Sequence, residues 1–292
     1  MFKKSIWYLS HITPHFRGKE FILRALSRPK NNYKKYLIKR NGVNFNISGQ
    51  DLNEFNLSIR QYHSKKLHIL INQIISFFKF KVFFDIGANI GGLSLPIINE
   101  NNNLHGYLFE PSPDVLSRLL ANISLNNKIV NRIKIYDFVI SNRTTLDKFY
   151  VSNEATNSGV GGAFKYINRK NETKLYKHFK SIDDLVGENK LLPVPQIIKI
   201  DVEGYEFEVL IGMQNILKNN NLVVIFEHSP THLTYRKFKI YKVNNFLNSI
   251  GYNIYNVNDL SLVKSKDLLK NNDFLAMKKN NYDQYMISKN KN

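Results

Sequence analysis

The stretch FFDIGANIGGLSL, residues 83–95, joins a short apolar run to an aspartate and a glycine-rich turn. An apolar run of this length that ends in such a turn is typical of a buried strand in a parallel sheet. The turn has the spacing D-x-G-x-x-x-G, from Asp85 through Gly87 to Gly91. It therefore lacks the G-x-G-x-x-G of dinucleotide-binding proteins and the G-x-x-x-x-G-K of phosphate loops. The pattern indicates a strand, a loop and a helix that together hold some other nucleotide-like ligand.

Beyond this stretch, β-rich runs alternate with longer helical periods. This order predicts an α/β fold in which a mostly parallel seven-stranded sheet carries helices on both faces. The closing strands could pair as an antiparallel edge hairpin. The predicted strands are residues 81–86, 105–110, 132–141, 195–201, 222–229, 251–257 and 273–279, with an additional strand at 145–152. The predicted helices are residues 65–78, 91–100, 111–127 (with Ser112 as N-cap), 203–217 and about 241–250.

Charge and composition limit the classes of function. The 292 residues carry a formal net charge of +19, and residues 1–40 hold eleven lysines and arginines against one acid, Glu20. This basic start favours contact with nucleic acid or a membrane surface, or reflects a compositional bias without function. The absence of cysteine excludes disulfides, thiolate metal sites and a cysteine nucleophile. Since no run approaches the ~18 apolar residues of a membrane span, we expect a cytoplasmic protein, with the inner membrane surface as an alternative location.

Three regions are predicted along the chain. Residues 1–80 form a basic, partly helical N-terminal extension, residues 81–280 form the main domain, and residues 281–292 form a frayed C-terminal tail. The polar, glycine-rich segment NEATNSGVGGAF, residues 153–164, is predicted to be a mobile loop.

Acidic residues stand at or near the ends of four predicted strands: Asp85, Glu110, Asp137 and Asp201. Ligands of open parallel sheets bind beyond the carboxyl ends of the strands, so these side chains are expected to meet there. Asp85 would repel a phosphate but attract a sulfonium or ammonium group, which favours S-adenosylmethionine over NAD or ATP. Glu110 could accept hydrogen bonds from ribose hydroxyls, and Asp137 could accept one from an adenine amino group.

The segment IIKIDVEGYEFEVLIGM, residues 197–213, carries Asp201 at a strand–helix junction, with Glu203 and Glu206 directly after it. Asp201 is expected to face the transferred methyl group and the acceptor. Glu227 and His228 end the next strand, and because side chains alternate, one of the two is expected to point into the cleft. His228 could be a general base, or Asp201 and Glu227 could share a divalent cation. No metal-ligand set is assigned.

The chain resembles the FkbM family of S-adenosylmethionine-dependent methyltransferases. The segments that carry the resemblance are FDIGANIGGLSL (84–95), FEPSPDVLSRLLANISLN (109–126), SIDDL (181–185), IIKIDVEGYEFEVLIGM and VVIFEHSP (223–230). The resemblance implies a Rossmann-like class I methyltransferase fold and O-methylation of a hydroxyl of a sugar, glycan or related natural product. It also implies that Asp85, Gly87, Asn89, Gly91 and Glu110 bind the cofactor and that Asp201 lies beside it. The segment YDFVIS, residues 136–141, departs from the family pattern, which weakens the adenine role of Asp137.

Two alternatives remain open at the level of sequence. One is an RNA 2′-O-methyltransferase that uses the basic extension to bind phosphates. The other is a non-catalytic membrane-surface protein that kept a methyltransferase-like fold. An NAD-dependent sugar oxidoreductase is disfavoured because the dinucleotide fingerprint is missing. The sequence does not identify the acceptor or the oligomeric state.

Overall fold

The computed structural model describes most of the chain from residue 35 onward. The described residues are 35–47, 54, 57, 64–152, 161–163, 172–187, 191–236, 239 and 241–289. The first 34 residues and most of the predicted mobile loop at 153–164 lie outside them, so the predictions made for those segments stay predictions.

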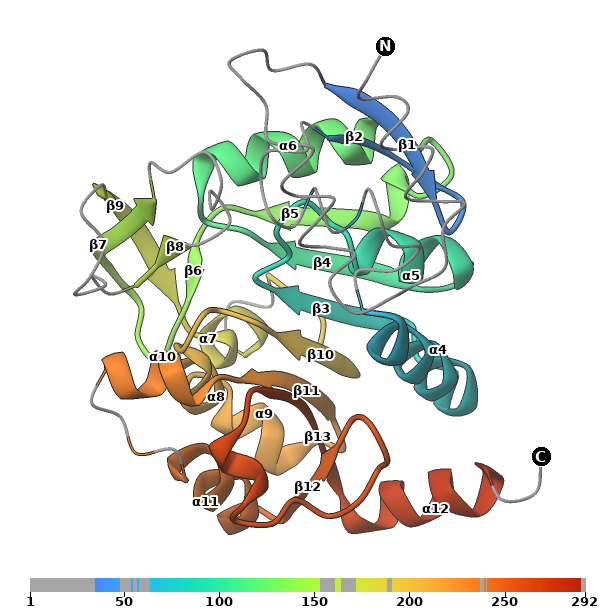
Figure 1. Cartoon of the computed structure of the whole chain (residues 1–292), viewed down its shortest axis with the longest axis vertical. Coiled ribbons are helices and arrows are strands. Elements are labelled where there is room, and N and C mark those ends of the chain that lie inside the picture. The colour runs from blue at the N-terminus through green and yellow to red at the C-terminus, as the bar shows by residue number, and fades with distance from the viewer. Residues whose placement is uncertain are drawn as a thin grey trace, which may run out of the picture.

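A seven-stranded sheet forms the centre of the molecule, with the strand order β12-β13-β11-β10-β3-β4-β5 (Figure 1). Neighbouring strands from β11 to β5 run parallel, while β13 is antiparallel to both β11 and β12. The mostly parallel sheet is confirmed, and the closing strands do pair with each other, but β13 inserts inside the sheet next to β11. The bounds are β3 (Val82–Ile86), β4 (His105–Phe109), β5 (Ile133–Tyr136), β10 (Ile197–Ile200), β11 (Val223–His228), β12 (Tyr252–Asn256) and β13 (Asn272–Lys278).

Helices cover both faces of this sheet, and each face has its own apolar core. Successive side chains of β3 show the division: Phe83 belongs to one core and Phe84 to the other, and both are fully buried. The first core also takes side chains from α4 (Lys65–Phe78), α5 (Ser94–Glu100) and α6 (Pro113–Ser124). The second takes them from α7 (Ile182–Val186), α8 (Glu206–Ile211), α9 (Gln214–Asn219) and α11 (Lys242–Ser249).

A smaller four-stranded sheet, ordered β6-β9-β7-β8, lies on the side to which the arrowheads of β3 and β4 point (Figure 1). The prediction of one strand over residues 132–141 is wrong, because the chain leaves the large sheet after Tyr136 and enters the small one at Val139. The rings of Tyr136 and Phe138 pack 5.4 Å apart across this break. The bounds are β6 (Val139–Ile140), β7 (Thr145–Ser152), β8 (Gly161–Gly162) and β9 (Glu172–Lys180).

The helix predicted over residues 203–217 begins late and is interrupted. Glu203 and Gly204 have φ values of 56° and 94°, so the first helical turn starts only at Glu206. The interruption falls at Gly212, where a Cβ would lie 1.8 Å from the carbonyl oxygen of Ser141. The close contact with the end of β6 therefore requires glycine at this position and separates α8 from α9.

The described part of the N-terminal extension packs into the first core. β1 (Tyr36–Arg40) and β2 (Val43–Ile47) form a hairpin. The β2 backbone binds to the last turn of α6 and the segment after it, because the N–H groups of Asn46 and Asn44 donate to the side chains of Asn122 and Asn126, each at 2.8 Å.

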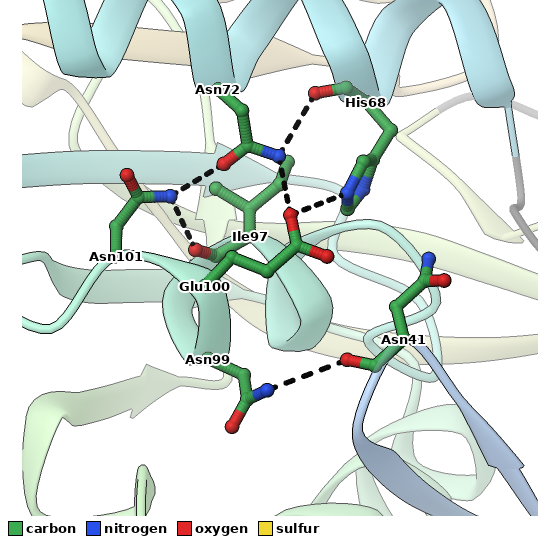
Figure 2. Close-up of polar contacts among 7 residues, drawn as sticks. All are labelled: Asn41, His68, Asn72, Ile97, Asn99, Glu100 and Asn101. Carbon is green, nitrogen blue, oxygen red and sulfur yellow. Dashed lines mark hydrogen bonds and ion pairs between the residues drawn. The ribbon is translucent and has the colours of Figure 1, made fainter.

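A polar network joins α4 to the end of α5 (Figure 2). The buried His68 contacts the Glu100 carboxylate at 2.8 Å, Asn72 donates to the same carboxylate at 2.8 Å, and Asn101 donates to the Asn72 carbonyl.

The C-terminal residues 279–289 form a helix, α12 (Lys279–Lys289), so the prediction of a frayed tail after residue 280 is wrong for them. Tyr285 is buried on α12, and its hydroxyl donates to the side-chain carbonyl of Gln73 on α4 at 3.2 Å. Within the described ranges, every helix falls short of the length and apolar character that crossing a membrane requires.

Candidate functional site

A cavity of about 220 Å³ opens at the carboxyl ends of β3, β4 and β10, where the small sheet contributes one of its walls. This is the place where open parallel sheets bind their ligands. The polar side of the cavity is formed by the glycine-rich turn after β3 and by Glu110, Lys199, Asp201, Glu203 and Glu227. The apolar side is formed by Phe109, Phe138, Val139, Ile140 and Phe149.

The glycine-rich turn is shaped by three positive φ angles. Gly87 has φ 82°, and a Cβ there would lie 2.0 Å from the carbonyl oxygen of Asp201, so glycine lets the ends of β3 and β10 meet at the cavity. Asn89, at φ 52°, lines the cavity next to it. Gly91, at φ 82°, was predicted to bind the cofactor, but it is not among the residues that line the cavity. A Cβ at Gly91 would lie 2.6 Å from the side chain of Leu95. Gly91 allows close helix packing, while the neighbouring Gly92 lines the cavity.

Glu110 lies at the end of β4 with its carboxylate held against the cavity wall. Its two oxygens accept the backbone N–H groups of Asn89, at 3.0 Å, and Ser112, at 2.9 Å. Ser112 does occupy the N-cap position of α6, but its side chain caps none of the described N–H groups. Burial raises the pKa of Glu110 to about 7, although both hydrogen bonds and Lys199 act in the opposite direction. A carboxylate held in this way still has lone pairs for the hydroxyl donors of a ligand.

Asp85 does not act as the sequence predicts. Its side chain is 1% exposed, and the Lys199 ammonium lies 3.3 Å from it, 3.2 Å from Asp201 and 3.1 Å from the carbonyl oxygen of Gly87. Burial lowers the pKa of Lys199, but the attraction of Asp201 and Asp85 outweighs it and holds that pKa above its ordinary value. Asp85 is thus buried and paired with Lys199, and it is not among the residues that line the cavity, so it does not face a cationic ligand directly as predicted.

Three further carboxyl groups line the cavity and lie near one another: Asp201, Glu203 and Glu227. The carboxyl group of Glu227 is strongly perturbed. Burial, together with the negative charges of Asp201 and Glu203, raises its pKa to about 10. Its Oε2 atom is buried and has no hydrogen-bond partner among the described residues. Glu206, by contrast, turns away into the loop, where its carboxylate accepts the N–H groups of Val202 and Gly204 at 3.2 and 3.0 Å.

His228 is not part of the site, so its predicted role as a general base is wrong. Its ring is buried on the opposite side of β11 from Glu227, packs on Phe274 and contacts the carbonyl oxygen of Leu268 at 2.9 Å. Another histidine, which the sequence reasoning missed, does reach the carboxyl cluster. His232, on α10 (Pro230–Tyr235), places its Nε2 atom 3.2 Å from the Glu203 carboxylate. A histidine one helical turn after a strand end gives no signal in the sequence pattern.

Asp137 is also placed away from the cavity. It lies at the break between the two sheets, its side chain is 65% exposed, and it pairs with Lys177 at 3.4 Å. Because the chain turns here, the ring of Phe138 lines the cavity in its place. The apolar lining that includes Phe109 and Phe149 offers contacts for an aromatic base, and Glu110 offers an acceptor for hydroxyls. These residues fit an adenosine-containing ligand such as S-adenosylmethionine.

Comparison with known proteins gives matches of three kinds. The family model of the methyltransferase FkbM domain matches residues 85–254, more than half of the 292-residue chain. The hexuronic acid methyltransferase AglP of Haloferax volcanii is 32% identical over 150 residues, which are 51% of this chain and 56% of that protein. The chain thus matches little more than half the length of this curated relative.

Among solved structures, the methyltransferase FkbM from Methylobacillus flagellatus KT is 16% identical, with a TM-score of 0.46 over 68% of this chain and 43% of that one. The precorrin-6y C5,15-methyltransferase from Geobacter metallireducens GS-15 is 14% identical, with a TM-score of 0.40 over 74% of this chain and 89% of that one. These similarities are too low to carry detail from either structure to this one.

Proposed function

The chain belongs to the methyltransferase FkbM domain family, and from this premise we propose that it is an S-adenosylmethionine-dependent O-methyltransferase acting on a hydroxyl of a sugar or glycan. The observation that carries the proposal is the cavity itself. Its lining combines the buried acceptor Glu110 and apolar side chains with the carboxyl groups of Asp201, Glu203 and Glu227. A nucleoside and a hydroxylated acceptor need these two different surroundings.

The residues that would hold the cofactor lie around the glycine-rich turn. The backbone of the turn lines the cavity at Gly87, Asn89 and Gly92. Glu110 would accept hydrogen bonds from the two ribose hydroxyls. Asp85 would act indirectly, because it fixes Lys199, which in turn holds the Gly87 carbonyl oxygen. When bound, S-adenosylmethionine supplies an electrophilic methyl group.

The chain's own contribution to the chemistry is alignment and the removal of a proton. Asp201 is the residue proposed to accept the hydroxyl proton of the acceptor. It is partly exposed at the cavity, and the ammonium of Lys199 at 3.2 Å favours its charged form. Burial raises the pKa of Glu227 to about 10, so Glu227 is a poorer candidate for the proton acceptor than Asp201.

The sugar class of the acceptor rests on the relative from Haloferax volcanii, whose name assigns it to hexuronic acids. We therefore take hexuronic acids as the first acceptors to test. The two alternatives, RNA 2′-hydroxyl methylation and a membrane-surface role, depend on the basic residues 1–40, of which the structure describes only 35–40. No contact of the described residues favours either alternative.

Calorimetric titration of the full chain with S-adenosylmethionine tests the proposal. Wild type should bind one equivalent, and Glu110→Ala should bind at least tenfold more weakly, since each ribose hydroxyl would lose a charged acceptor worth ~1.5–3 kcal/mol. Glu100→Gln, which alters a carboxylate in the network of Figure 2, is the matched control and should bind like wild type. If wild type does not bind S-adenosylmethionine, the proposed function is wrong. Transfer of a labelled methyl group to uronic-acid oligosaccharides then tests the acceptor class.

A further inference from the structure

We propose that Glu203, Glu227 and His232 form a binding site for a divalent cation at the cavity. The cation would hold the oxygen atoms of an acidic sugar acceptor in front of the methyl donor. The role toward the acceptor rests on the proposed function, whereas the binding of the cation does not.

The three side chains converge from separate elements with the spacing of metal ligands. Glu203 comes from the loop after β10, Glu227 from the end of β11 and His232 from α10, and one ligand atom of each lies within 4.8 Å of the others. The Nε2 atom of His232 and the nearest oxygen of Glu203 are 3.2 Å apart. Ligands bound at right angles at ~2.1 Å from an ion are about 3 Å apart, and ligands on opposite sides about 4.2 Å. One ion fits this set with small movements of the side chains.

Glu227 provides an independent indication that a ligand belongs here. It lines the cavity, and its buried Oε2 atom has no hydrogen-bond partner among the described residues. A buried carboxylate oxygen without a donor costs free energy, so such groups are normally paired with a donor or coordinate a metal. The nearby ammonium of Lys199 does not fill this role, because Asp85, Asp201 and the Gly87 carbonyl oxygen surround it.

The local backbone places the ligands close together. Gly204 has φ 94°, and a Cβ there would lie 2.8 Å from the Cβ of His232, so only glycine lets α10 approach the loop this closely. Arg236, one turn after His232, donates to the Gly204 carbonyl oxygen and to the Glu208 carboxylate, which ties α10 to both the loop and α8. The approach of His232 to Glu203 is thus held by contacts that involve neither side chain.

Charge determines which acceptor the site suits. A hexuronic acid carries a carboxylate, and the cavity wall already holds the carboxyl groups of Asp201 and Glu203. Without a counter-ion, like charges at these distances repel the acceptor. A divalent cation reverses the sign and can bind the acceptor carboxylate together with a neighbouring hydroxyl. The mixed carboxylate and imidazole donors suit Mn²⁺ or Zn²⁺.

Electron paramagnetic resonance of Mn²⁺ added to the full chain tests the site directly. We expect one bound Mn²⁺ per chain and nitrogen modulation of its signal from the imidazole of His232. Glu203→Gln, Glu227→Gln and His232→Asn should each weaken binding by at least ~10-fold. His68→Asn, in the His68–Glu100 pair between α4 and α5, is the matched control and should leave Mn²⁺ binding unchanged. Circular dichroism identifies any variant that fails to fold, and the nitrogen modulation of wild type remains decisive in that case.

The proposal is overturned if wild type binds no Mn²⁺ below about 1 mM, or if bound Mn²⁺ shows no nitrogen ligand. It is also overturned if all three folded variants bind Mn²⁺ like wild type. Addition of glucuronate should change the Mn²⁺ signal, and an unchanged signal removes the acceptor role while the cation site stands. Failure to bind S-adenosylmethionine would instead overturn the proposed function and would leave the Mn²⁺ result unaffected.

Discussion

Two histidine–glutamate pairs among the described residues have similar geometry but opposite surroundings. His68 and Glu100 are 2.8 Å apart, and the same carboxylate accepts a hydrogen bond from Asn72 (Figure 2). His232 and Glu203 are 3.2 Å apart, and the groups next to them are further carboxylates at the wall of a cavity. In the first pair neutral amides complete the hydrogen bonding. In the second, negative charge accumulates and a buried oxygen of Glu227 is left without a donor among the described residues. The first arrangement stabilises the fold, and the second is suited to a ligand.

The largest expected effect is a loss of methyl-transfer rate when Asp201, which lines the cavity, is substituted. Asp201→Asn removes the proposed proton acceptor but keeps the shape of the side chain. We expect the rate of methyl transfer to fall by ~10²–10⁴-fold, which is the usual contribution of a general base. The affinity for S-adenosylmethionine should change by no more than a few fold. Single-turnover kinetics with labelled cofactor measures both quantities.

Glu100→Gln is the control for this experiment and should transfer methyl groups at the wild-type rate. An Asp201→Asn variant that is folded and as active as wild type would assign the proton acceptor to another residue.

The second prediction concerns the backbone at the cavity. Gly87→Ala introduces a Cβ 2.0 Å from the Asp201 carbonyl oxygen at a φ of 82°, so strain and a clash combine. Gly251→Ala has nearly the same φ, 85°, but its Cβ meets nothing within 4 Å among the described residues. We expect Gly251→Ala to lower the free energy of unfolding by ~1 kcal/mol and Gly87→Ala to lower it by ~3 kcal/mol or more. Urea denaturation measures both, and equal losses would show that the contact between β3 and β10 can relax.

The sequence predicts the strands of the large sheet better than the small sheet, and burial explains the difference. β3, β10 and β11 are buried on both faces, so their apolar runs mark them to within two residues. β9 was not predicted, because its sequence, ETKLYKHFK, contains few apolar residues and most of its side chains are exposed or only partly buried. Periodicity carries no information about such a strand, since it is stabilised by pairing with β7.

The site shows the same limit of sequence analysis. Three acidic residues at strand ends, Glu110, Asp201 and Glu227, do line the same cavity, because the carboxyl ends of parallel strands lie at the same edge of the sheet. The alternation rule also holds, as one of Glu227 and His228 faces the cavity, but it cannot say which. The pairing of Asp85 with Lys199 and the arrival of His232 depend on contacts between distant segments, and those contacts leave no local pattern.

The third prediction tests the structural pair. Glu100→Ala leaves the buried imidazole of His68 and the amide of Asn72 without their common acceptor. We expect the free energy of unfolding to fall by ~1–3 kcal/mol, as for other buried donors that lose a partner. Binding of S-adenosylmethionine and of Mn²⁺ should stay as in wild type, because this pair only joins α4 to α5. A loss of ligand binding at unchanged stability would contradict the division between the two pairs.

The last effect is a pH dependence of stability that arises from a residue at the cavity. Burial raises the pKa of Glu110 to about 7, from an ordinary value of 4.5 in the unfolded chain. The folded state therefore binds more protons between these values, so the stability linked to Glu110 is present below pH 4.5 and is lost as the pH rises through about 7. Glu110→Gln cannot ionise and should lack this loss. Relative to wild type, the variant should gain on the order of 2 kcal/mol between pH 5 and pH 7.5.

Urea denaturation at a series of pH values measures this difference. Glu206, whose pKa burial also raises to about 7, titrates in both proteins, so the difference between them reports Glu110 alone. Parallel pH profiles of the two proteins would show that burial does not raise the pKa of Glu110. In that case its hydrogen bonds from Asn89 and Ser112 offset the free-energy cost of burying the charge completely.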